Sequence, residues 1–85
     1  MRNRHAWTER DEDGTKHEVE AHKEQGRWRL RSKVNGGEHW TPLDPPSLEQ
    51  MNTLRDILWR KYQRRRASHE DVVLADRMLA ELKAP

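Results

Sequence analysis

Two periodicities divide this chain. Between His5 and Thr41 the apolar residues recur at every second position, whereas from Ser47 onward they recur at every third or fourth position. The first spacing is typical of antiparallel strands with one buried face, and the second is typical of amphipathic helices. The stretch Leu43–Pro46 separates them, because a residue before proline is kept out of the helical conformation. The sequence therefore predicts an α+β domain, in which a four-stranded antiparallel β-meander is followed by a C-terminal two-helix hairpin packed on one sheet face.

Turn residues divide the first part of the chain into four expected strands, at about residues 5–10, 16–22, 27–34 and 38–41. A four-residue loop at 23–26 would set Glu20 opposite Arg29 and Glu18 opposite Arg31. Such cross-strand pairs would neutralise two of the arginines in the third strand, which reads RWRLRSKV.

The turn Asn35-Gly36-Gly37 leads to the last expected strand. A three-residue loop with Gly37 in the left-handed conformation would place Trp40 opposite Ser32, on the apolar face of the sheet. Because the chain has no phenylalanine, we expect all four tryptophans, including Trp59, to belong to the core. The apolar sheet face would then consist of Trp7, Val19, Ala21, Trp28, Leu30, Val34 and Trp40.

Two helix starts carry the same signature. Ser47 with Gln50, and Ser68 with Asp71, have the spacing of capping boxes, which predicts helices at about 47–66 and 68–82. Each helix has one apolar stripe. The stripes contain Leu48, Met51, Leu54, Leu58, Trp59 and Tyr62 in the first helix, and Val72, Leu74, Ala75, Met78, Leu79 and Leu82 in the second.

Length and composition narrow the class of protein. A chain of 85 residues has room for one domain with a thin core. It contains no cysteine, which excludes disulfides and thiolate metal sites and suits a reducing cytoplasm. No apolar run approaches the roughly 18 residues that a membrane span needs, and the polar start does not resemble a signal peptide. We therefore expect a cytoplasmic protein with no membrane contact.

Positive charge is concentrated in the middle of the chain. Residues 27–66 hold ten basic and four acidic groups, although the net charge of the whole chain is only +2. The densest run is RKYQRRR, from Arg60 to Arg66, where five of seven residues are basic. Arginine clusters of this kind grip phosphate oxygens, but a basic helix end also interacts favourably with the helix dipole. A nucleic-acid partner and a solvated helix end are both compatible with the run.

Residues for catalysis or metal binding are not evident in the sequence. His17 and His22 lie five positions apart, so on a strand they point to opposite faces, and no pair with helical ligand spacing occurs. We expect His17 to form a hydrogen bond to Glu9 across the first hairpin. Two of the three serines are expected helix caps, and no phosphate-binding loop or paired acidic motif is present. The sequence therefore predicts no enzyme activity, no cofactor and no metal site.

The prediction that remains is a small non-catalytic interaction module. Ile57 is expected to be exposed among the basic residues of the first helix, with Val73 similarly exposed on the second, and such residues favour a protein partner or self-association. The alternative is a nucleic-acid-binding protein that uses the third strand and the end of the first helix. The candidate surface for either function contains Arg27, Arg29, Arg31, Lys33, Ile57, Arg60, Lys61, Arg64, Arg65 and Arg66.

Overall fold

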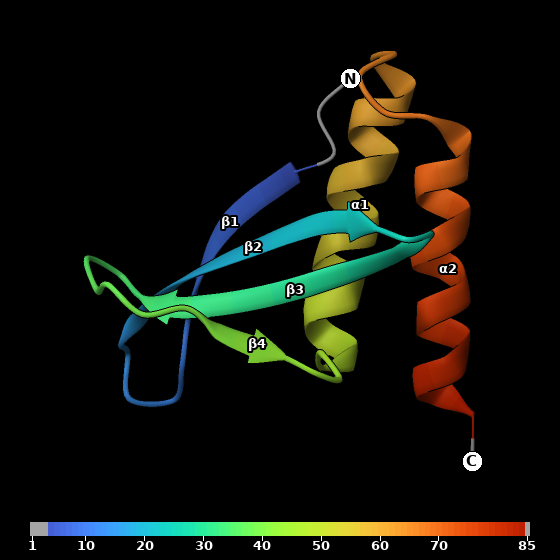
Figure 1. Cartoon of the computed structure of the whole chain (residues 1–85). Helices are drawn as coiled ribbons and strands as arrows, with labels where there is room; N and C mark the ends of the chain where they lie inside the picture. The colour runs from blue at the N-terminus through green and yellow to red at the C-terminus, as the bar shows by residue number, and fades with distance from the viewer. Residues whose placement is uncertain (1–3, 85) are drawn as a thin grey trace.

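Four antiparallel strands and two helices follow one another in a computed structural model, which describes residues 4–84. The strands form one sheet in the order β1-β2-β3-β4, and both helices follow the sheet in the chain (Figure 1). This architecture is the predicted α+β meander with a helical hairpin. The elements are β1 (Arg4–Arg10), β2 (Lys16–Glu24), β3 (Arg27–Val34), β4 (Thr41–Leu43), α1 (Leu48–Gln63) and α2 (His69–Lys83).

The turn between β2 and β3 is shorter than predicted. It contains only Gln25 and Gly26, whose φ angles are 51° and 74°, and positive φ at both central residues is what a type I′ hairpin turn requires. The register therefore moves by two residues, so that Glu20 pairs with Arg31 and not with Arg29. Because two residues are one full period of a strand, every side chain keeps its predicted face.

The fourth strand is also displaced. It begins at Thr41, which pairs with Ser32, so Trp40 lies beside Lys33 and not opposite Ser32. Gly36 has the positive φ of 81°, and Gly37 instead donates its backbone N–H to the carbonyl of Val34. The displacement sets Leu43 opposite Leu30, which places an aliphatic side chain against the core.

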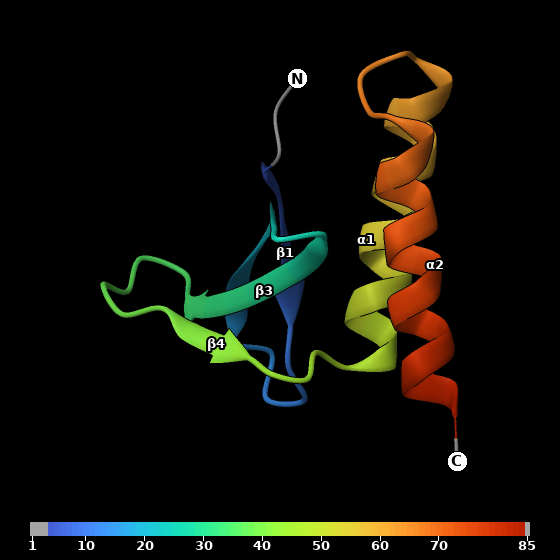
Figure 2. The ribbon, with the colours of Figure 1, turned by 45° about the vertical axis from the view of Figure 1, so that its right-hand side comes forward.

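The helices pack side by side against one face of the sheet, and no other element of residues 4–84 covers the opposite face (Figure 2). Both predicted capping boxes are present, at Ser47 and at Ser68. Helix α1 ends at Gln63, three residues earlier than predicted, because Arg65 takes the left-handed conformation with φ of 60°. No helix between residues 4 and 84 is long and apolar enough to cross a membrane.

The core lies between the sheet and the helices. Val34 shares the sheet face of the core residues but is exposed, because it lies at the end of β3. The fully buried members with the largest side chains are Trp28, Met51, Leu54, Leu58 and Val19, with Ala21, Leu30, Val72, Ala75, Met78 and Leu79 around them.

Candidate functional site

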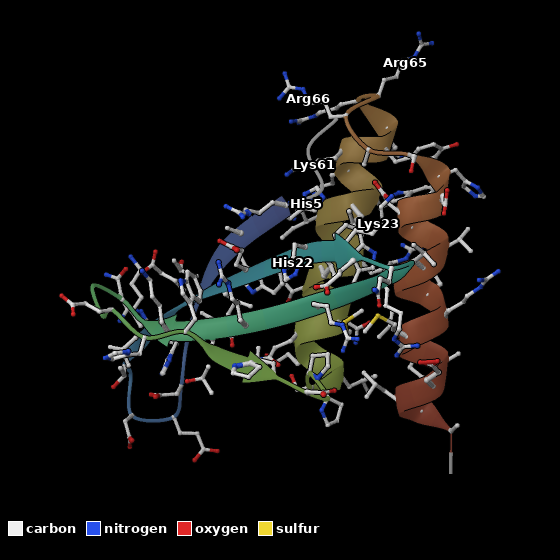
Figure 3. The ribbon with its side chains drawn as sticks, in the orientation of Figure 1. His5, His22, Lys23, Lys61, Arg65 and Arg66 are labelled. Carbon is white, nitrogen blue, oxygen red and sulfur yellow. The ribbon has the colours of Figure 1, made fainter. Side chains whose placement is uncertain are left out.

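The predicted site residues fall into two groups on different parts of the molecule. The strand residues belong to β3, whereas Arg65 and Arg66 project from the end of the helical hairpin, beyond the margin of the sheet (Figure 3). Lys61 points toward His5 of β1, below that end. The two groups therefore do not form one continuous basic surface.

On the uncovered sheet face, most cations have an acidic partner. Glu20 accepts hydrogen bonds from Nη2 and Nε of Arg31 at 2.8 and 3.2 Å, and it also lies 3.5 Å from Arg4. Lys33 lies 3.7 Å from Glu18. The cross-strand neutralisation expected from the sequence occurs, with the partners shifted by one strand period.

Arg27 and Arg29 have different surroundings from Arg31 and Lys33. Arg27 donates a pair of hydrogen bonds to Glu81 of α2, at 3.1 and 3.2 Å, which raises the pKa of the guanidinium and lowers the pKa of the Glu81 carboxyl. Arg29 is exposed and has no ion-pair partner among residues 4–84. It is thus the only arginine of β3 available to an anion, within the described chain.

Trp40 lies on the uncovered sheet face and not in the core. Its ring centre is 4.4 Å from the Arg31 guanidinium carbon and 4.8 Å from the Lys33 ammonium nitrogen. The prediction of a core tryptophan is wrong here because Leu43 occupies the inner position at this end of β4. Both cations are therefore held by a carboxylate and an aromatic ring at the same time.

Four arginines lie near the junction of the two helices: Arg60 in the last turn of α1, and Arg64, Arg65 and Arg66 in the connection to α2. We call these four the basic turn. All four are exposed, and none forms an ion pair with a residue between 4 and 84. The backbone holds the last three in place, because Arg65 donates its N–H to the carbonyl of Tyr62 and Arg66 donates to that of Lys61, at 2.9 and 2.7 Å. The turn therefore presents a dense positive charge on an ordered backbone.

Three rings lie next to the basic turn and form what we call the aromatic row: Trp59, Tyr62 and His69. Their successive centroids are 5.7 and 5.6 Å apart. Trp59 is 37% exposed, so the prediction that it belongs to the core is wrong. The Arg55 guanidinium lies 5.2 Å from its ring centre and also donates to Asp76 of α2.

Lys61 has a role that the sequence did not reveal. Its ammonium lies 2.8 Å from Nδ1 of His5, a side chain that is only 2% exposed and that meets Trp28 edge to face. Burial and the Lys61 charge lower the pKa of His5, against a smaller opposite effect of Asp71. His5 is therefore neutral at pH 7, and its Nδ1 accepts the hydrogen bond.

A second buried pair lies beside it. Lys23 donates to Asp71 at 2.8 Å, and this bond raises the pKa of Lys23. Asp71 is 3% exposed and also completes the capping box of α2, while its backbone carbonyl accepts from the Trp28 indole. These groups join β2 and β3 to the start of α2.

Ile57 and Val73 are partly buried and not exposed as predicted. Ile57 lies on the same side of α1 as Gln50 and Lys61, which contact Glu9 and His5 of β1. The sheet therefore covers a wider face of α1 than the helical periodicity of the sequence indicates.

The remaining histidines do not assemble a metal site. His17 bonds to Asp11 at 2.9 Å and not to Glu9, which instead accepts from Gln50, and the bond from His17 lowers the pKa of Asp11. His22 bonds to Glu24 of its own strand. Within residues 4–84 there is no group of three or more His, Asp or Glu side chains that could hold a metal ion.

Comparison with known proteins adds no relative: no family model matches the chain, and no curated protein or solved structure is significantly similar to it.

Proposed function

We propose that this domain is a non-catalytic module that binds single-stranded nucleic acid through the basic turn and the aromatic row. The observation that carries the proposal is the juxtaposition of four exposed arginines without ion-pair partners, within the described chain, and a row of three partly exposed rings. Single-strand binding combines these two elements, because cations follow the phosphates and rings stack on unpaired bases.

The basic turn suits phosphate better than the uncovered sheet face does. Arginine presents several N–H donors that match phosphate oxygens in pairs. On the sheet face, Arg31 would have to leave both Glu20 and Trp40 before it could bind a phosphate. At the basic turn no such contact with a carboxylate has to be broken among residues 4–84. A ligand anion therefore displaces no carboxylate there, and only Arg60 has a protein acceptor within the described residues, the backbone carbonyl of Asp56 at 3.3 Å.

The aromatic row supplies a place for bases. Trp59 and Tyr62 are one helical turn apart on α1, and His69 opens α2, so the rings span the seam between the helices. Bases in a duplex are already stacked on one another and could not reach these rings. This difference favours a single strand over a double helix as the ligand.

A protein-interaction surface, the first prediction from the sequence, has less support. It depended on Ile57 and Val73 as exposed apolar residues among charges, and both side chains are partly buried. The large hydrophobic residues that are exposed do not adjoin one another: Val34 ends β3, and Leu48 and Trp59 lie about three turns apart on α1. Of the two functions, nucleic-acid binding is the one whose required groups, exposed arginines and aromatic rings, lie together in one place.

The test is a titration of fluorescein-labelled, mixed-sequence 20-nucleotide RNA and DNA, followed by anisotropy at several salt concentrations between about 50 and 200 mM. The variant R64Q/R65Q/R66Q should bind much more weakly. Because each single-strand phosphate contact contributes about 0.7 to the slope of log K against log salt, the slope should fall by about 2. The matched control is K16Q/R77Q/K83Q, which removes the same charge from exposed positions elsewhere.

A second pair of variants separates stacking from charge. W59L should lose about tenfold in affinity for the single strand, whereas W40L, on the uncovered sheet face, should bind normally. Equal losses in the two charge variants would mean that only net charge matters. Equal affinity for a duplex and a single strand would reject the stacking part of the proposal.

A further inference from the structure

A groove lies along the edge of β3, away from the basic turn. Strand β4 pairs only with Leu30, Arg31 and Ser32, so within the described part of the chain residues 27–29 have no strand partner on that side (Figure 1). The space beside them is a cavity of about 360 Å³, bounded by β3, the segment Leu43–Pro46 and the last turns of α2. We call it the β3 groove.

The backbone at Trp28 faces this groove. In a two-residue hairpin the residues that flank the turn, here Glu24 and Arg27, exchange hydrogen bonds. Antiparallel pairing alternates, so the next residue, Trp28, directs its N–H and C=O away from β2 and toward the side of β4. No strand residue among 4–84 receives them there. This edge could therefore accept one more short strand.

The floor and rim of the groove differ in chemistry. The floor is apolar and is formed by Trp28, Leu30, Pro46, Met78 and Leu82. The rim carries Arg29, which has no ion-pair partner among residues 4–84. The rim carboxylates already have partners, since Glu81 binds Arg27, Asp44 lies near Arg27, and Glu24 is hydrogen-bonded to His22. One further carboxylate would be matched at Arg29.

The pleat of the sheet fixes the order of side chains in such a strand. A residue opposite Arg29 points to the uncovered sheet face, and the following residue, opposite Trp28, points to the apolar floor. In the antiparallel direction of β4, a carboxylate must therefore come directly before an apolar side chain. We propose that the β3 groove binds an extended segment of a partner protein with an acidic residue followed by a large apolar residue, which adds to the sheet beside Trp28.

The probe is the peptide acetyl-Glu-Leu-Thr-Ser-amide, which starts at the residue opposite Arg29 because Leu43 already pairs with Leu30. It is titrated into isotope-labelled full-length protein. We expect saturable shifts of the Trp28 and Arg29 amides and of the Met78 methyl group. Replacing Glu by Gln in the peptide, or making R29Q in the protein, should weaken binding by about fivefold each, and the double change should cost little more than either one. The control R10Q removes an exposed charge from β1 and should bind the peptide normally.

Several results would overturn the proposal. No shift at millimolar peptide, or equal shifts with a peptide in which Ser replaces Leu, would exclude this mode of binding. If N-acetyl-leucine, a small amphipathic carboxylate, binds as tightly as the peptide, strand addition contributes nothing and the groove takes small molecules. If the same signals move when protein concentration alone is raised, a second copy occupies the groove.

Discussion

Arginines of the uncovered sheet face and arginines of the basic turn have the same chemistry and opposite surroundings. Arg31 is held by Glu20 and covered by Trp40, whereas Arg64, Arg65 and Arg66 extend from an ordered turn without an acidic partner among residues 4–84. The first arrangement contributes to the stability of the sheet, and the second leaves charge available to a ligand. The difference lies in the pairing of the arginines and not in their number, and it is the reason for placing the proposed nucleic-acid site at the basic turn.

The largest effect is expected at the most buried ion pair, Lys23 with Asp71. D71N should lower the free energy of unfolding by about 2 kcal/mol, because it weakens the bond to Lys23 within a partly desolvated site. Urea denaturation measures the loss. D76N, which removes the exposed partner of Arg55, should change stability by less than about 0.5 kcal/mol. Similar losses in both variants would show that burial does not distinguish these pairs.

A smaller loss is expected on the uncovered sheet face. E20Q should lower the free energy of unfolding by about 1.5 kcal/mol, because Glu20 is mostly buried and is the ion-pair partner of both Arg31 and Arg4. R66Q, at the basic turn, should leave stability within about 0.5 kcal/mol of the wild type. Chemical denaturation of both variants tests the comparison directly, and a larger loss in R66Q would reverse it.

The His5–Lys61 contact predicts a dependence of stability on pH. Because the pKa of His5 is lowered in the folded state, the unfolded chain binds the proton more readily. Above pH 6.5, the ordinary pKa of a histidine, His5 does not reduce the free energy of unfolding. As the pH decreases from 6.5 toward the lowered pKa of the folded state, the free energy of unfolding falls. The wild type should lose more stability than H5Q between about pH 7.5 and 5.5.

Urea denaturation at the two pH values measures that difference. Lys61 and Asp71 are the charged groups that act on His5. Equal losses in H5Q and the wild type would assign the pH dependence to other residues, such as the exposed histidines.

The smallest effect concerns Arg65. Its φ of 60° is unfavourable for a side chain with a Cβ atom, so R65G should raise the free energy of unfolding by about 0.5 kcal/mol. The same change should weaken nucleic-acid binding, since it removes one arginine of the basic turn. A stabilised variant with full affinity would mean that Arg65 does not contact the ligand. Thermal unfolding and anisotropy on the same sample measure both quantities.

The order of elements could be predicted because strong local signals agree with one another. The change of periodicity, the proline pair and two serine capping boxes each mark an element boundary, and the structure has all of them. The faces of β2 and β3 were also predictable, because an error of two residues in register leaves every side chain on its face.

The details of pairing were not predictable, because each depends on competition between two local choices. A left-handed conformation is uncommon for a residue such as Gln25, so no common turn signal marks the two-residue turn. At β4, the register determines whether Leu43 or Trp40 faces the core, and no local sequence signal distinguishes the two registers. The buried pairs of His5 with Lys61 and of Lys23 with Asp71 join residues far apart in the chain, which no local pattern reports.

The turn at Gln25 and Gly26 has a consequence for how such a chain can change in length. One residue added there would flip either β2 or β3, turning Glu20 toward the core or Trp28 toward water, and the domain would lose its fold. The six-residue connection 35–40 leads only to the three pairs of β4, at the sheet margin. Descendants of this chain should therefore vary in length between β3 and β4 and keep the turn between β2 and β3 unchanged.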